Sequence, residues 1–247
     1  MTDELSLRVD ITASLLFTRK PQYPLPSSLI PHCALPIPHD ILTPALQALA
    51  KEAQIAEDIY TIEILTCLQS LYAIASYIES DIAVNHHAPW QDEESIGLRL
   101  NPLAHRLLSL PPLSGSSSAF RGNHTATALQ LGQIIWIIWV KRRYRAYPGS
   151  PAGYASKLLG LMMVDELGGG QELEFLPVRL WLLVLCAVSC SEREKGVAVG
   201  MIGDVMSRWG LNSWSAVMSH VTQMPWVSML DALCTDIERS CIITSHS

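Results

Sequence analysis

The chain has 247 residues, of which 49% are hydrophobic and only 16% are charged, against a charged share of about 25% in typical globular proteins. This composition excludes a disordered or collagen-like chain, because the apolar surface is large enough to offset the conformational entropy lost on folding. With 17 basic and 23 acidic residues the formal net charge is −6, which argues against a general electrostatic affinity for nucleic acid.

The N-terminal residues do not resemble a targeting segment. Residues 1–20 carry acidic side chains where a secretory signal requires a basic segment followed by an apolar one. The longest uninterrupted apolar stretches, 134–140 and 180–188, have seven and nine residues, well short of the roughly 20 that a membrane span requires. Six cysteines without a signal predict reduced thiols inside the cell. We therefore expect a soluble protein without membrane contact.

Prolines are concentrated near the N-terminus. Seven of the fifteen fall within residues 21–44, and each removes a backbone donor and fixes φ, so regular structure cannot continue through this stretch. We expect an extended arm that wraps the surface. The length fits one domain with a short appendage. We therefore divide the chain into an N-terminal segment with a Pro-rich arm (1–44) and a helical domain (45–247).

Helical periodicity begins after the arm. Apolar residues recur at steps of three and four over 55–78, which predicts one amphipathic helix. A shorter helix is predicted at about 98–108, before a proline pair. The next is predicted at about 123–145. Its centre, 134–140, is apolar on every side, so this helix should lie in the middle of the fold.

The remainder of the chain is also predicted to be helical. Pro177 suits the first turn of a helix, and Gly210 suits the position just after the end of one. No segment alternates cleanly between polar and apolar residues, and Asn-Gly or Asp-Gly hairpin turns are absent. The predicted fold is all-α, an irregular multi-helix bundle preceded by the Pro-rich arm. Helices are expected here at 152–167, 177–189, 192–209, 213–223 and 226–240.

Three tryptophans on the most apolar helices are the candidate ligand-pocket residues. Trp136, Trp139 and Trp181 carry indole N–H groups, which need acceptors when buried. Core packing is one interpretation of their position. The alternative is a small-molecule cavity lined by these rings.

A weak basic patch lies at the C-terminal end of the helix predicted at 123–145. Lys141, Arg142, Arg143 and Arg145 follow one another, with Tyr144 among them. The ordinary interpretation is a solvated helix end, because cations are favoured near the C-terminal end of the helix dipole. Contact with nucleic acid is the alternative.

No catalytic residue, metal site or cofactor is predicted. The nucleophile elbow, the phosphate-binding glycine loop and the zinc-protease motif are all absent from the sequence. Cys186 and Cys190 lie four residues apart and would share a helix face, but a zinc site would need two more ligands nearby. We therefore predict that both are small residues of the core.

A set of short segments follows in a fixed order from about residue 7 to residue 240. The segments are Leu7-Arg8-Val9-Asp10, His105-Arg106-Leu107-Leu108-Ser109-Leu110-Pro111-Pro112, Trp139 with Pro148, Trp181-Leu182-Leu183-Val184 leading to Ser191-Glu192-Arg193, and Gly210-Leu211-Asn212-Ser213-Trp214 with Val217-Met218, Met224-Pro225-Trp226 and Leu230. In this order and spacing they resemble the regulatory region, or "fungal-specific transcription factor domain", of fungal zinc-cluster transcription factors.

The resemblance implies a nuclear, all-helical regulatory module that controls transcription, often of nutrient-use or secondary-metabolite genes. Such modules sense signals and mediate self-association. The six-cysteine DNA-binding motif of the family is missing, because the cysteines are scattered along the chain. The first part of the usual region is also missing, as in a shortened relative or a truncated gene product.

We therefore expect a regulator that acts through a protein partner, self-association or a small-molecule effector. Direct, sequence-specific DNA binding by this chain is not expected. The nucleus is the expected location, with the cytoplasm as the alternative. The alternative function is a stand-alone helical enzyme or ligand-binding protein of a biosynthetic pathway.

Overall fold

The computed structural model describes residues 2–25, 41–85, 93–110, 122–147, 149–164 and 175–244. Within these ranges every regular element is a helix, which confirms the all-α multi-helix fold. Most of the Pro-rich arm, residues 26–40, lies outside the described part, so the extended arm stays a prediction. The elements are α1 (Thr2–Phe17), α2 (Pro44–Ile55), α3 (Ile59–Asn85), α4 (Glu93–Ser109), α5 (Gly122–Arg143), α6 (Ala152–Val164), α7 (Leu176–Ala187), α8 (Glu192–Trp209), α9 (Trp214–Val221), the short 3-10 helix η4 (Ser228–Leu230) and α10 (Asp231–Thr244).

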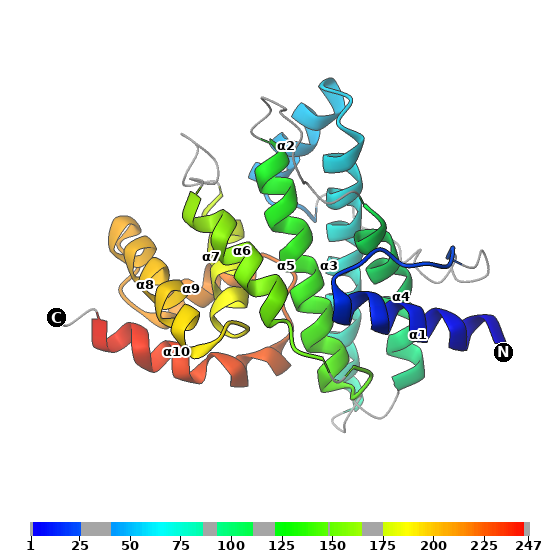
Figure 1. Cartoon of the computed structure of the whole chain (residues 1–247). Coiled ribbons are helices and arrows are strands. Elements are labelled where there is room, and N and C mark those ends of the chain that lie inside the picture. Colours follow the sequence, from blue (N-terminus) through cyan, green and yellow to red (C-terminus); the bar gives the residue numbers. More distant parts are fainter. Residues whose placement is uncertain are drawn as a thin grey trace.

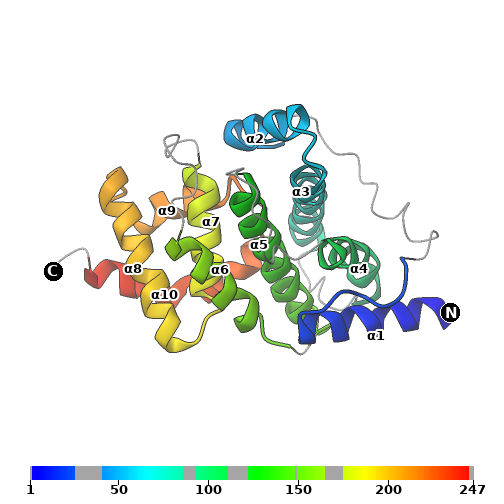
Figure 2. The same cartoon turned by 45° about the horizontal axis from the view of Figure 1, so that its top comes forward.

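Helix α5 forms the centre of the molecule (Figure 1). It packs against α3 and α4 on one side and against α6 and α7 on the other. Helices α8, α9 and α10 extend the bundle beyond α7, whereas α1 lies at the opposite end against α4 (Figure 2). Within 134–140 every side chain except that of Trp139 is buried. The apolar centre of this helix therefore does occupy the middle of the fold, as the sequence predicted.

The N-terminal helix α1 was not predicted. Leu7, Ile11 and Leu15 recur at steps of four and are buried in the common core, as the spacing of one helical face requires. The helix packs against α4. Helix α1 thus contributes to the same core as the rest of the chain.

A buried carboxylate holds the start of the arm against α1. Asp10 Oδ2 accepts hydrogen bonds from the backbone N–H groups of Gln22 and Tyr23, at 2.8 and 3.0 Å. On the other side, His105 Nε2 of α4 donates to the Tyr23 carbonyl at 2.8 Å. The described first residues of the arm, 21–25, contain no helix and lie against α1 and α4.

The single helix predicted over 55–78 is wrong at its beginning. Helix α2, which was not predicted, ends at Ile55, and α3 begins only at Ile59. Between them Glu57 takes φ +54°, and Asp58 caps α3 by accepting bonds from the N–H and the hydroxyl of Thr61. Ile55 and Ile59 are 76% and 73% exposed. The apolar spacing therefore continues across a turn by coincidence.

The C-terminal helices lie close to the predicted ranges. Helix α8 has the predicted bounds, because Ser191 and Glu194 form a capping box at its start and Gly210 at φ +65° ends it. Pro177 occupies the first turn of α7. The helix predicted from residue 226 begins only at Asp231, after η4.

Helix α3 is long and apolar enough to cross a membrane by length and composition over Ile59–Ala83. More than half of its most apolar window is buried against the rest of the protein. Such burial is typical of a core helix of a soluble protein, but the absence of membrane contact stays a prediction.

Candidate functional site

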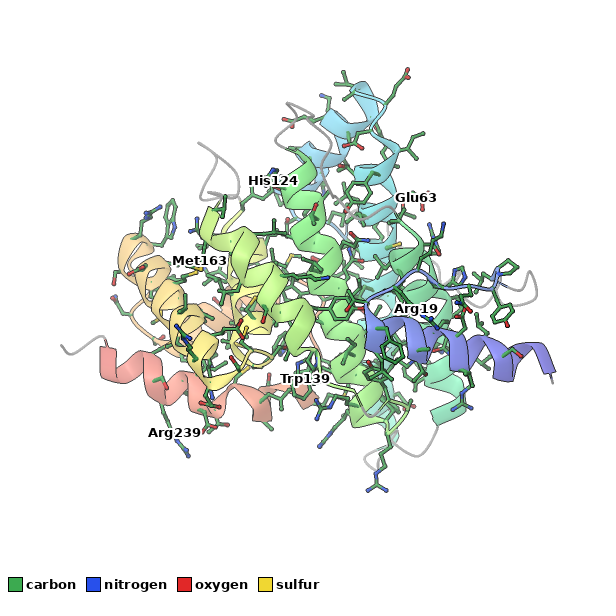
Figure 3. All side chains as sticks on the ribbon, in the orientation of Figure 1. Arg19, Glu63, His124, Trp139, Met163 and Arg239 are labelled. Carbon is green, nitrogen blue, oxygen red and sulfur yellow. The ribbon has the colours of Figure 1, made fainter. Side chains whose placement is uncertain are left out.

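The three candidate tryptophans are placed by packing and hydrogen bonds. Trp136 and Trp181 are fully buried, and Trp139 is half-buried near the C-terminal end of α5 (Figure 3). Trp181 Nε1 donates to the Pro225 carbonyl at 2.9 Å, and Trp139 Nε1 donates to Ser189 Oγ at 2.8 Å. Trp136 Nε1 is buried and has no acceptor in the described part of the chain. These rings line neither of the two cavities described below.

The basic patch is smaller on the surface than in the sequence. Lys141 is only 2% exposed, and its Nζ donates to Asn101 Oδ1 of α4 at 2.7 Å. The prediction that it belongs to a solvated patch is therefore wrong, because its side chain points into the α4–α5 contact. Arg142, Arg143 and Arg145 are exposed. The Arg142 guanidinium lies 4.7 Å from the centre of the Trp139 ring, as in a cation–π contact.

The cysteine pair at the end of α7 is partly accessible. Cys186 is buried, whereas Cys190 is half-buried, so only the first is a core residue as predicted. A hydrogen bond between the thiols lowers the pKa of Cys190 and, together with burial, raises that of Cys186. Among the described residues, no three His, Cys, Asp or Glu side chains gather as ligands of a metal ion would.

A cavity of about 960 Å³ lies where the C-terminal ends of α1 and α4 meet α5 and α6. The described residues that line it come from the turn after α1, from the end of α4 and from α5 and α6. They are Thr18, Arg19, Lys20, Leu107, Leu108, Ser109, Leu110, Thr127, Gln130, Leu131, Ile134, Tyr154, Lys157, Gly160 and Leu161.

Helical spacing explains how two of these helices face the cavity. From α5 come residues 127, 130, 131 and 134, and from α6 come residues 154, 157, 160 and 161. Both sets follow steps of three and four, so each set occupies one face of its helix. The α5 face combines leucine and isoleucine with Thr127 and Gln130. The cavity wall is thus mostly apolar, with a few polar groups at fixed positions.

Gln130 forms a fixed polar point in this wall. Its Nε2 donates to the Leu107 carbonyl at 2.7 Å, and its Oε1 accepts a bond from the Tyr60 hydroxyl at 2.7 Å. Burial raises the pKa of Tyr60 to about 12, so that hydroxyl remains a neutral donor near pH 7. The amide is therefore held between α3 and α4 and supports the α5 side of the cavity.

Tyr154 joins α6 to the end of α1. Its hydroxyl donates to the Leu15 carbonyl at 3.1 Å and is also hydrogen-bonded to the Thr18 side chain. Burial raises the pKa of Tyr154 to about 12, so this phenol also stays neutral. These bonds fix the C-terminal end of α1 against α6 at the cavity.

Helix α1 is followed by a residue with an unusual backbone conformation. Thr18 takes φ +50°, a left-handed conformation that a β-branched residue rarely adopts. The N–H of Arg19 then donates to the Ser14 carbonyl at 3.0 Å, the bond that closes a Schellman motif. Because glycine is the usual residue here, Thr18 stores backbone strain at a cavity wall, which is typical of functional sites.

A second cavity, of about 540 Å³, lies between α3, α9 and α10. Two of its acidic side chains are already engaged: Glu79 Oε1 accepts bonds from the N–H and hydroxyl of Ser228, and Asp231 Oδ1 accepts one from Trp226 Nε1 at 2.8 Å. These contacts hold η4 in place. The second cavity is therefore the weaker candidate for a ligand site.

The first cavity was not predicted from the sequence. Its walls join residues as far apart in sequence as Thr18 and Lys157, and periodicity within one helix carries no information on such contacts. One local signal was present: Thr127 and Gln130 place polar groups on one face of a helix that is otherwise apolar at its centre.

No known protein family matches the sequence, and no curated protein or solved structure matches the chain. The resemblance to the regulatory region of fungal zinc-cluster factors therefore stays a prediction.

Proposed function

We propose that the chain is a regulatory module that responds to a small organic molecule bound in the cavity between α1, α4, α5 and α6. The cavity itself carries the proposal. Its volume of about 960 Å³ is within the range of about 300–1,000 Å³ typical of small-molecule sites. Its mostly apolar wall with a few fixed polar groups is also the usual composition of such sites.

The chemistry of the lining favours binding over catalysis. The described lining residues include no Asp, Glu, His or Cys, the residue types that most often act as general acids, bases or nucleophiles. The pKa of Tyr154 is raised to about 12, far from the value that a general base needs near neutral pH. The polar side chains of the cavity lining can instead orient a ligand by hydrogen bonds.

The position of the cavity supports a regulatory role. One wall is the turn after α1, which contains the strained Thr18 and follows the helix end that Tyr154 holds. A ligand that contacts this wall would bind differently to states in which α1 is docked or released, and only such a difference in affinity can shift a conformational equilibrium. Ligand binding would then change the surface around α1 that contacts a protein partner or a second copy of the chain.

The biological setting of the proposal comes from the sequence resemblance. It suggests a nuclear module that regulates transcription, with secondary-metabolite or nutrient-use genes as the targets. In this proposal the module acts on transcription through protein contacts.

Occupancy of the cavity can be tested by blocking it. A Cβ atom added at Gly160, which lines the cavity, or at Gly153, which does not, would meet no heavy atom within 4 Å. Native mass spectrometry of the purified wild type should detect a bound small molecule. Gly160→Leu should lose it, whereas the matched control Gly153→Leu on the same helix should keep it.

The regulatory role can be tested in cells. The chain is fused to a heterologous DNA-binding domain, and reporter transcription is measured for the wild type, Gly160→Leu and Gly153→Leu. We expect Gly160→Leu alone to change the output. Chemical conversion of the bound molecule by the purified chain, with an unchanged reporter, would favour the enzyme instead. In mobility-shift titrations the chain alone should show no preference for one duplex sequence over scrambled competitor.

A further inference from the structure

The cavity combines an apolar interior with a basic edge. The apolar part comes chiefly from Leu107, Leu131 and Ile134. The basic side chains come from two places that are far apart in sequence, Arg19 and Lys20 after α1 and Lys157 on α6. Figure 3 shows Arg19 at the end of α1 where that helix reaches α5. The three basic residues therefore line one cavity although they come from distant parts of the sequence.

These cations have no acidic counterpart among the described residues that line the cavity. No described residue that lines it carries a carboxylate, and no ion pair joins Arg19, Lys20 or Lys157 to a described acidic residue. The Arg19 guanidinium carbon lies 5.8 Å from the centre of the Phe17 ring. The protein as a whole is acidic, with a net charge of −6. The cavity lining therefore carries three positive charges in a protein whose net charge is negative.

Hydrogen bonds hold the two basic elements together. Tyr154 is one helical turn from Lys157, and its hydroxyl bonds the Leu15 carbonyl at the end of α1. Thr18 contacts the same hydroxyl and directly precedes Arg19. The Schellman bond from Arg19 to Ser14 then sets where the chain leaves α1. These bonds fix the turn that carries Arg19 relative to the helix that carries Lys157.

We propose that the ligand of this cavity is an amphipathic organic anion. Its apolar body lies against α4 and α5, and its acidic head group lies at Arg19, Lys20 and Lys157. Hydrogen bonds between ionised partners are roughly twice as strong as neutral ones, and the apolar wall supplies the remaining affinity. An inorganic anion would leave the apolar wall unfilled, so it fits less well. The inference rests on the proposed function in that the cavity must accept a small molecule.

A pair of fluorescent probes tests the head group. 1-Anilinonaphthalene-8-sulfonate and N-phenyl-1-naphthylamine share the same aromatic body, and only the first carries an anionic group. We expect the anionic probe to bind at least about tenfold more tightly at low salt. Its advantage should fall as ionic strength rises, because exposed charges are screened.

Charge variants assign the effect to the basic edge. Lys157→Gln and the double variant Arg19→Gln/Lys20→Gln should each weaken binding of the anionic probe about fivefold or more, and leave the neutral probe within twofold of the wild type. Lys51→Gln is the matched control, because Lys51 is exposed on α2 and does not line the cavity. It should leave both probes unchanged. Gly160→Leu should abolish binding of both probes, which excludes attachment elsewhere on the surface.

The outcomes separate the inference from the proposed function. Equal affinity for the two probes, both lost in Gly160→Leu, would overturn the anionic ligand and leave the cavity as a neutral-ligand site. Binding of neither probe, or binding that Gly160→Leu does not affect, would overturn both proposals. Sedimentation of the probe complex provides a further check. If binding weakens as a dimer forms at higher protein concentration, a second copy of the chain covers the cavity, and the anionic ligand is again rejected.

Discussion

Gly132 on α5 packs directly against the indole ring of Trp181 on α7. A Cβ atom at Gly132 would lie 2.8 Å from Cζ3 of that ring and 2.5 Å from Cδ2 of Leu182, closer than side chains pack in protein interiors. Both helices are apolar and buried where they cross. The absence of a side chain at Gly132 therefore sets the distance between the two central helices.

Gly132→Ala should destabilise the fold although alanine favours helix. The gain in helix propensity is about 1 kcal/mol, whereas overpacking a close-packed core costs about 1–3 kcal/mol and more where neighbours cannot move. We expect a lower urea midpoint with an unchanged slope. Gly200→Ala on α8 is the control, because its Cβ would meet nothing within 4 Å. That variant should be slightly stabilised, and equal stability of the two would contradict the close approach.

Trp136 and Trp181 should respond differently to replacement by phenylalanine. Replacing either by alanine should cost about 3–5 kcal/mol of unfolding free energy, since both rings are fully buried. Trp181→Phe also leaves the Pro225 carbonyl without its donor, whereas Trp136→Phe removes an N–H that has no acceptor in the described residues. We therefore expect Trp181→Phe to be the more destabilising by about 1 kcal/mol or more in chemical denaturation. The reverse order would mean that the Trp136 indole has an acceptor after all.

Local patterns predicted the helices whose signals are local. The apolar centre of α5, the capping box of α8 and Gly210 at its end are each contained in a few consecutive residues. The start of α3 was mistaken, because Asp58 and Glu57 break a periodicity that Ile55 and Ile59 happen to continue. Helix α1 was not predicted although Leu7, Ile11 and Leu15 show its spacing, so here a local signal was overlooked.

The candidate site was predicted less well than the fold. Lys141 belongs to a basic run in the sequence, but the helix turns its side chain toward Asn101, and only the three-dimensional packing decides which residues of a run are exposed. The residues Arg19 and Lys157 line the same cavity because Tyr154 bonds the Leu15 carbonyl and so holds α6 against the end of α1. A single sequence gives no indication of that contact.

Cys190 should react with alkylating agents faster than the buried thiols. The neighbouring Cys186 thiol lowers the pKa of Cys190, and the thiolate is the reactive form. Iodoacetamide labelling near pH 8, followed by peptide mass spectrometry, should modify Cys190 before Cys186, Cys234 and Cys241. Cys186→Ala removes the donor and should slow the labelling of Cys190, whereas Cys234→Ala should not. Equal rates in both variants would show that exposure alone controls the reaction.

The hydroxyl of Tyr154 should make the docking of α1 sensitive to alkaline pH. Folding raises its pKa from 10.0 to about 12 because the phenol is buried. A group whose pKa is raised by folding stabilises the folded state fully below its unfolded value, so this contribution is present below pH 10 and is lost between pH 10 and about 12. Tyr154→Phe lacks the bond to Leu15, which costs about 1 kcal/mol at pH 7, but it has no phenol to ionise. Its unfolding free energy should therefore fall less steeply than that of the wild type over this window.

Urea titrations at a series of pH values would measure both slopes. Tyr77→Phe is the control, because the Tyr77 side chain is exposed on α3; its curve should follow the wild type, and a Tyr154→Phe curve that also does so would rule out Tyr154 as the alkaline sensor.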